Sequence, residues 1–180
     1  MDGVNPKVIV ILAGTNNVGR DPGDDAKVAD ITSGIQAIID LCRKKAPRAT
    51  IILTAIFPRN DNIAVVPIIN RINENIASFA DGRKIRFLNI NDKLAGADGV
   101  LLEGVMVDKL HLTLKGYQIW ADALKPLFRK ILGPPSARDQ APPATGDPSK
   151  STVEKRKLNE SQINKRSNIR LHRGAQAIFT

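Results

Sequence analysis

The sequence predicts an α/β protein in which a parallel β-sheet lies between two layers of helices. Three short segments, 7–13, 50–57 and 84–90, are rich in β-branched residues and largely apolar at consecutive positions, which is typical of strands covered on both faces. The stretches between them carry apolar residues every three or four positions, the period of an amphipathic helix. Such alternation requires parallel strands with right-handed crossovers, so we expect a three-layer sandwich.

The first predicted strand, 7–13, runs into a loop at 14–17 that reads Gly-Thr-Asn-Asn. A helix should follow, because apolar residues recur at helical spacing at Val28, Ile31, Ile35, Ile38, Ile39 and Cys42. Asp24 or Asp25 is suited to cap its N-terminus, since a carboxylate oxygen can accept a hydrogen bond from a free backbone amide. Lys44, Lys45 and Pro47 indicate where it ends.

The second strand, 50–57, is followed by a loop at 58–62 and by a helix whose apolar positions are Val65, Ile69, Ile72, Ile76 and Phe79, with Pro67 in its first turn. After the third strand comes a polar excursion at 91–104. Thr113 should cap a last helix whose inner face would consist of Tyr117, Trp120, Ala121, Leu124, Phe128 and Ile131. Gly133 and two prolines should end it.

The positive charge is concentrated near the C-terminus. The chain has 27 Lys and Arg against 18 Asp and Glu, and residues 134–180 contain 9 of the basic residues but only 4 of the acidic ones. We expect an α/β domain at 1–133, a Pro/Ser-rich linker at 134–152 and a basic tail at 153–180. Such a tail can bind nucleic acid through its charge, although a solvated tail is the commoner explanation.

Cysteine content and hydropathy exclude several classes of protein. The single cysteine, Cys42, cannot form an internal disulfide, so nothing requires an oxidising compartment. The sequence has no apolar run approaching the roughly 20 residues of a membrane span, and its first residues lack the pattern of a signal peptide. We therefore expect a cytoplasmic protein without a membrane partner.

Three polar residues are expected at the carboxyl side of the sheet. Asp108 stands three residues before His111, ahead of the last helix, and Asn16 follows the first strand. An imidazole can accept a proton near neutral pH when a carboxylate fixes its tautomer, and an amide NH2 can donate to a developing oxyanion. The alternative is structural: Asp108 and His111 as capping or surface groups, and Asn16 as a turn former.

These residues lie in two motifs that resemble those of the SGNH hydrolases, also called the GDSL esterase and lipase family. Residues 14–17 resemble the family's third block in the form found in the platelet-activating-factor acetylhydrolase-like branch, and 108–117 resemble the fifth block, Asp-x-x-His. Residues 2–7 and 56–59 are similar to neighbouring family segments. The resemblance covers residues 2 to about 133 and leaves out the tail.

The resemblance implies a flavodoxin-like SGNH fold and a hydrolytic site. His111 would be the general base, Asp108 would orient it, and Asn16 would donate into the oxyanion hole, with Gly14, Thr15 and Asn17 in the site loop. Such a site needs neither a metal nor a cofactor. The expected substrates are small carboxylic esters with short acyl or acetyl groups.

The sequence departs from the family pattern at its start, because the Gly-Asp-Ser block that supplies the nucleophile is absent. The nucleophile is therefore unknown: Ser33 and Ser78 fall on predicted helices, and the remaining serines lie in the linker and tail. We expect an N-terminally truncated sheet whose strand 7–13 is an exposed edge. Hence we expect a homo-oligomer, in which two copies join at that strand about a two-fold axis or the edge is completed by a swapped tail. The alternative function is a non-catalytic remnant that acts as an assembly or binding module, with nucleic-acid binding by the tail as a further possibility.

Overall fold

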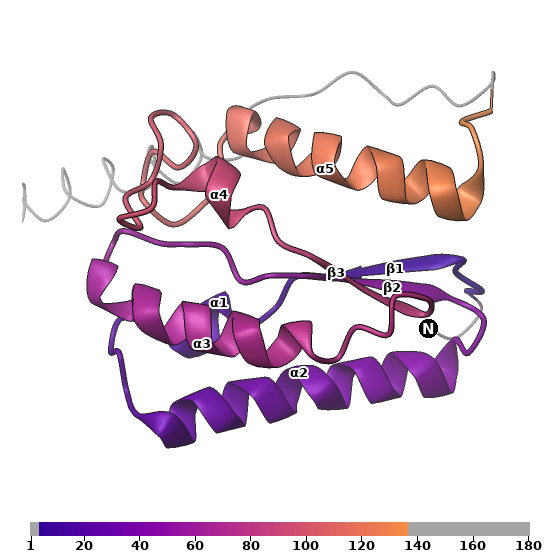
Figure 1. Cartoon of the computed structure of the whole chain (residues 1–180), viewed down its shortest axis with the longest axis horizontal. Helices are drawn as coiled ribbons and strands as arrows, with labels where there is room; N and C mark the ends of the chain where they lie inside the picture. Colours follow the sequence, from indigo (N-terminus) through magenta and orange to yellow (C-terminus); the bar gives the residue numbers. More distant parts are fainter. Residues whose placement is uncertain (1–3, 137–180) are drawn as a thin grey trace, which may run out of the picture.

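Three parallel strands form the centre of the computed structural model, which describes residues 4–136 (Figure 1). They are β1 (Val8–Ile11), β2 (Thr50–Thr54) and β3 (Ile85–Leu88), in the spatial order β1-β2-β3. Pairing brings Ile9, Ile51 and Ile85 into one row across the sheet, and Ile11, Leu53 and Phe87 into the next. The parallel α/β fold predicted from the sequence is therefore confirmed.

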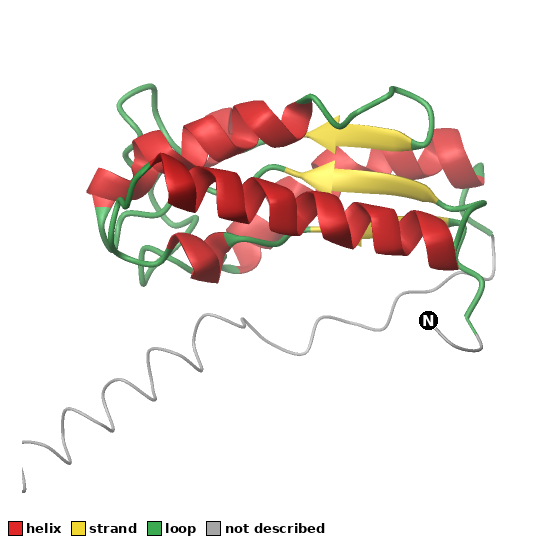
Figure 2. Ribbon diagram, turned by 90° about the horizontal axis from the view of Figure 1, so that it is seen from below, coloured by secondary structure: helices red, strands yellow, loops and turns green. Residues whose placement is uncertain are grey.

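Two helices cover one face of this sheet: α2 (Asp25–Lys45) and α3 (Val66–Ala77). Figure 2, viewed from their side, shows helices running along the strands, whose arrows point toward one end of the molecule. The two isoleucine-rich rows of the sheet pack against Val28, Ile31, Ile35, Ile39 and Cys42 of α2 and against Ile68, Ile69, Ile72 and Ile76 of α3. This cluster is the main hydrophobic core.

The predicted start of α2 is correct, but one of its apolar residues is misplaced. Asp24 is the N-cap, and its side chain accepts a hydrogen bond from the Lys27 amide at 3.1 Å. Ile38 is 41% exposed and does not belong to the inner face. A short 3-10 helix, η1 (Ile63–Val65), precedes α3, and Pro67 lies in the first turn of α3 as expected.

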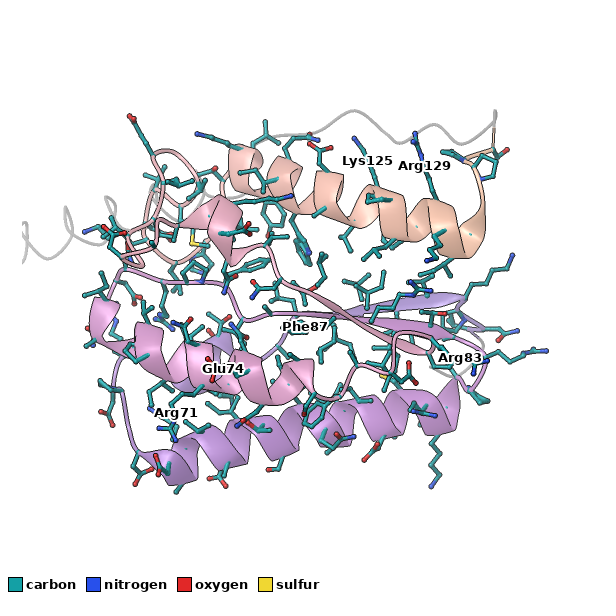
Figure 3. All side chains as sticks on the ribbon, viewed as in Figure 1. Arg71, Glu74, Arg83, Phe87, Lys125 and Arg129 are labelled. Atoms are coloured by element: carbon teal, nitrogen blue, oxygen red, sulfur yellow. The ribbon has the colours of Figure 1, made fainter. Side chains whose placement is uncertain are left out.

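The opposite face is covered by α5 (Leu114–Leu132) and by the segment that contains α4 (Asn91–Leu94) (Figure 1). A second apolar cluster lies there, built from Phe57, Ile90, Leu94, Val105, Met106 and Leu112, with Ile119, Trp120 and Ala123 of α5 packed against it. Lys125 and Arg129 point away from the sheet (Figure 3). Thr113 caps α5 by accepting a hydrogen bond from the Gly116 amide at 3.3 Å, and Gly133 ends the helix, both as predicted.

The inner face predicted for α5 is partly wrong. Leu124 is buried and Trp120, Phe128 and Ile131 are half-buried, but Ala121 is exposed and Tyr117 is 43% exposed. The helix approaches the core through Gly116, where an added Cβ would lie 2.7 Å from the Val105 carbonyl oxygen. This close contact fixes the rotation of the helix and turns Ala123 rather than Ala121 inward.

Two predicted loops contain regular structure. Residues 15–18 form a single helical turn, α1 (Thr15–Val18), instead of an open loop, and the 91–104 excursion contains α4 and an antiparallel bridge between Ala95 and Leu101. The conformation of each of these short segments depends on its contacts with other parts of the fold.

β1 lies at an edge of the sheet. Within residues 4–136 it pairs with β2 alone. Val8, Ile9 and Val10 are half-buried, whereas Ile51 to Thr54 of the central strand are all buried. The exposed edge expected from the sequence is therefore present.

No helix within residues 4–136 is both long and apolar enough to cross a membrane. The basic tail expected at 153–180, and the linker beyond residue 136, lie outside the described residues.

Candidate active site

A pocket of about 240 Å³ opens beyond the carboxyl ends of β1 and β2. The turn after β1, the loop after β2 and the segment before α5 all contribute to it, which is where open α/β sheets place ligands. It is lined by Leu12, Thr15, Asn16, Phe57, Pro58, Leu110, His111, Leu112, Tyr117 and Trp120. Asn16 and His111, 95 positions apart in the sequence, therefore share one cavity.

A tight turn at Gly14 brings Asn16 to this pocket. Gly14 has a φ of 109°, a value that favours glycine, and a Cβ there would lie 2.6 Å from the Ile56 Cδ1 atom. The Val18 amide donates to the Gly14 carbonyl at 2.9 Å, and the Val18 side chain is fully buried. The turn is anchored at both ends, and the Asn16 side chain remains exposed at the pocket.

Asp108 fixes the orientation of His111. Its Oδ2 atom lies 2.7 Å from His111 Nδ1, while its Oδ1 atom accepts hydrogen bonds from the backbone amides of His111 at 2.8 Å and Leu110 at 3.1 Å. The Asp108 side chain is 3% exposed and that of His111 is 56% exposed. Since Nδ1 is engaged, Nε2 is the nitrogen left available to the pocket.

The backbone between these residues takes an unusual conformation. Lys109 has a φ of 65°, the only positive φ of a non-glycine residue in 4–136. This left-handed residue turns the chain back so that the amides at 110 and 111 reach the carboxylate. The Asp-x-x-His spacing seen in the sequence is thus a compact turn and not part of α5.

Two opposing effects act on the Asp108 carboxyl. Burial acts to raise its pKa, but hydrogen bonds from the His111 amide and ring and from the Leu110 amide outweigh burial, and the pKa lies below its usual value. An ionised Asp108 stabilises the imidazolium that forms when His111 accepts a proton.

The other wall of the pocket is aromatic. Trp120 meets Phe57 edge to face, with ring centroids 5.5 Å apart and an interplanar angle of 86°, and Tyr117 lies 6.3 Å from Trp120. Leu12, Leu110 and Leu112 add to this surface. The pocket therefore combines a proton acceptor and an amide donor with an apolar wall.

The structure separates the predicted site-loop residues. Thr15 lines the pocket beside Asn16 and His111. Gly14 and Asn17 instead border a depression against α2, together with Asp30 and other residues of that helix. Because residues 15–18 form a helical turn, successive side chains point to different sides. This could not be predicted while the segment was expected to be a loop.

Neither Ser33 on α2 nor Ser78, the residue after α3, lines the pocket. The Ser33 hydroxyl donates to the Asp30 carbonyl and the Ser78 hydroxyl to the Asn75 carbonyl. In the part of the chain that the structure describes, the pocket-lining hydroxyls are those of Thr15 and Tyr117. The same part contains no group of three or more His, Cys, Asp or Glu side chains placed to hold a metal ion.

The loop after β2 supports this site, although it was not among the site residues predicted from the sequence. Arg59 is 4% exposed, and its guanidinium group donates to the Thr15 carbonyl. The Asn60 backbone amide donates to the Lys109 carbonyl. A charged residue next to a predicted buried strand was the available signal, because arginine is rarely buried without partners.

Comparisons with known proteins point to one group of enzymes. Residues 1–119 match the GDSL-like Lipase/Acylhydrolase family. The human platelet-activating factor acetylhydrolase IB subunit alpha1 is 30% identical over 142 residues, which are 78% of this chain and 57% of that protein. The rat alpha2 subunit is 30% identical over 134 residues, covering 73% of this chain and 55% of that subunit.

A solved structure gives the same result. A GDSL-like lipase from Bacteroides thetaiotaomicron superimposes with a TM-score of 0.60 at 27% identity, covering 71% of this chain and 64% of that chain. The chain thus spans less than two thirds of the length of the relatives it matches.

Proposed function

Because the chain belongs to the GDSL-like lipase/acylhydrolase family, we propose that it hydrolyses small carboxylic esters, with short acyl or acetyl groups, in the pocket between Asn16 and His111. The observation that carries this proposal is the 2.7 Å contact between Asp108 and His111 in a cavity that Asn16 also lines. Esters of small acyl groups fit the size of the pocket and its apolar wall.

Each polar group has one task in the proposed reaction. His111 Nε2 accepts the proton of an attacking hydroxyl group or water as its oxygen bonds to the ester carbonyl carbon. The Asn16 NH2 group donates a hydrogen bond to the carbonyl oxygen as it becomes an oxyanion. When the tetrahedral intermediate collapses, the bond to the leaving alkoxide breaks and His111 returns the proton to it.

The group that attacks the ester carbonyl carbon is not assigned to a residue of this chain. The Gly-Asp-Ser serine of the family does not occur in this sequence, and the minimum mechanism uses a water molecule activated by His111. Direct attack by water is slower than a two-step route through an acyl-enzyme, because the covalent intermediate divides one high barrier into two lower ones. We therefore expect a low rate if water is the nucleophile.

Hydrolysis of a short-chain aryl acetate tests the proposal. His111→Ala should lower kcat/KM by roughly 10²-fold or more, the usual contribution of a general base. The matched control is His172→Ala, which removes the other histidine of the chain and corrects for unspecific catalysis by imidazole. Equal rates for the parent and His111→Ala would refute the assignment.

A second candidate is a non-catalytic assembly or binding module, favoured by the open edge of β1. In that case the folded protein would show no turnover of the aryl acetate but would form a stable oligomer. Nucleic-acid binding by residues 153–173 would be a separate property, and it would have to weaken as the salt concentration rises.

A further inference from the structure

The two halves of the proposed site are not bonded to each other. Within residues 4–136, no hydrogen bond joins the turn that carries Asn16, residues 14–19, to the segment that carries Asp108 and His111, residues 107–112. The relative position of the amide donor and the imidazole must therefore be set by a third element. The loop after β2, residues 58–62, contacts both segments.

On one side, this loop holds the Asn16 turn through a guanidinium group. Arg59 Nη1 donates to the Thr15 carbonyl at 2.9 Å, one peptide unit from Asn16. Arg59 Nε and Nη2 both donate to the Asp61 carboxylate, at 2.6 Å each, and Arg20 Nε adds a bond to Asp61 at 3.2 Å. The side chains of Arg59 and Asp61 are 5% and 7% exposed, so water has little access to this pair, whereas Arg20 is 69% exposed.

On the other side, the loop holds the Asp-His segment through Asn60. The Asn60 backbone amide donates to the Lys109 carbonyl at 2.9 Å. Lys109 is the residue whose positive φ shapes the Asp108–His111 turn. The Asn60 side chain donates to the Gly99 carbonyl at 2.9 Å and accepts from the Leu101 amide at 2.7 Å. Adjacent residues of one loop thus engage both halves of the site.

We infer that Arg59 is a positioning residue that, together with Asn60, sets the distance between the Asn16 side chain and the His111 ring. The inference rests on the proposed function for its catalytic consequence, but the positioning itself is a property of the fold. Arg59 touches no reacting atom; it acts through the Thr15 carbonyl. Its planar guanidinium group serves Thr15 and Asp61 at the same time, and a lysine ammonium cannot reproduce this geometry.

The ionic character of the cluster supports this role. Hydrogen bonding from Arg59 lowers the pKa of Asp61 from 3.8 to about 2, against a smaller opposing effect of burial, and Arg20 contributes to the lowering. Asp61 therefore stays ionised at neutral pH. Above about pH 4 the ionised Asp61 carboxylate keeps the buried guanidinium of Arg59 paired, and Arg59 is oriented toward the Thr15 carbonyl.

The test replaces Arg59 by Lys and measures two quantities. Hydrogen exchange should accelerate at the Val18 amide, which closes the Asn16 turn, by about tenfold more than at the amides of β2, since local opening exposes the turn without unfolding the sheet. With an aryl acetate, kcat should fall by roughly 10- to 100-fold while KM changes by less than about twofold, because misplaced groups weaken binding of the transition state and not of the ester.

The matched control is Arg71→Lys. Arg71 lies on α3, where Figure 3 labels it, and pairs with Asp25 at 2.8 Å in an exposed ion pair. This variant should change neither exchange at Val18 nor kcat. If Arg59→Lys does not fold, Asp61→Asn is used instead, because it keeps Arg59 but removes its counter-ion.

The outcomes separate the inference from the proposed function. If exchange accelerates equally at Val18 and in β2, Arg59 contributes only to general stability. If exchange accelerates at neither place, Arg59 does not hold the turn. Either result would overturn positioning by Arg59. If the parent shows no turnover but exchange at Val18 responds selectively, positioning holds and the esterase proposal fails. If the parent is active, selective exchange with an unchanged kcat would show that Arg59 holds the turn without setting the distance between Asn16 and His111, and this would also overturn the inference.

Discussion

The Asp61 carboxylate shows how much of this site depends on single charged groups. Asp61 belongs to a polar loop, for which the sequence alone suggests a position at the protein surface. Its side chain is nevertheless only 7% exposed and forms ion pairs with two arginines. Nothing in the pattern around residues 58–62 distinguishes it from a turn residue. Only its partners, Arg59 and the distant Arg20, give it a structural role.

Unfolding of the protein should depend on pH through Asp61. Its pKa is about 2 in the folded state, against 3.8 for the unperturbed group, so the folded state favours the ionised form. The stabilisation is complete above about pH 4 and is lost as pH falls toward 2; a shift of this size corresponds to on the order of 2 kcal/mol. Urea titrations between pH 2 and 7 measure it.

Asp61→Asn provides the comparison. The difference in unfolding free energy between parent and Asp61→Asn should be largest near pH 7 and shrink as the solution becomes acidic. The control is Asp25→Asn, whose carboxylate is 88% exposed and should contribute little at any pH. A difference that stays constant over the whole pH range would contradict the structural role given to Asp61.

At the scale of the elements, α3 supports the loop after β2 through the buried side-chain amide of Asn73. The Asn73 side chain accepts a hydrogen bond from the Ile56 amide at 2.7 Å and donates to the Ile56 carbonyl at 2.9 Å. These bonds continue the pairing of β2 past its last residue and fix the start of the loop that carries Arg59. Asn73 is 5% exposed, so water cannot replace it.

Asn73→Ala should therefore destabilise the fold. It leaves the buried Ile56 amide without its partner, which typically costs about 1–3 kcal/mol. Asn75→Ala on the same helix is the matched control: Asn75 is exposed, and its removal should cost no more than about 0.5 kcal/mol. Chemical denaturation of both variants decides the point, and equal losses would show that the buried amide has no special role.

The helices also show where periodicity is reliable. The apolar spacing predicted the inner face of α2 apart from Ile38. For α3 it predicted Ile69, Ile72 and Ile76 but missed the buried Ile68, while Val65 and Phe79 pack against the core from outside the helix. The rotation of α5 was predicted less well. It is set by the contact of Gly116 with Val105, two residues whose proximity follows from the path of the 91–113 segment.

At the scale of the whole molecule, β1 is an edge strand of the sheet within residues 4–136. The Lys7 carbonyl accepts from the Thr50 amide at 2.9 Å, so odd-numbered positions of the strand face β2. By the alternation of a parallel ladder, the backbone groups of Val8 and Val10 face the open edge. We propose that two copies pair through this edge to form a homo-oligomer.

Val10→Lys tests the pairing. Val10 is half-buried and belongs to neither apolar cluster, so a lysine there places a charge at the edge with little damage to the core. Sedimentation equilibrium at tens of micromolar should show the parent as an oligomer and Val10→Lys shifted toward monomer. Leu41→Lys, at a helix position that is 53% exposed, should behave as the parent does. A monomeric parent would exclude the proposal.

The sequence by itself determined the parallel α/β fold and the grouping of Asn16, Asp108 and His111. These follow from hydrophobic period, from the end of the sheet at which strands terminate and from the spacing within two motifs, all of which are local properties. Only the tertiary structure decided that residues 15–18 form a helical turn facing two ways, that α5 rotates on Gly116, and that Arg59 links the two halves of the pocket. Each of these depends on contacts between residues far apart in the chain, and no local pattern encodes them.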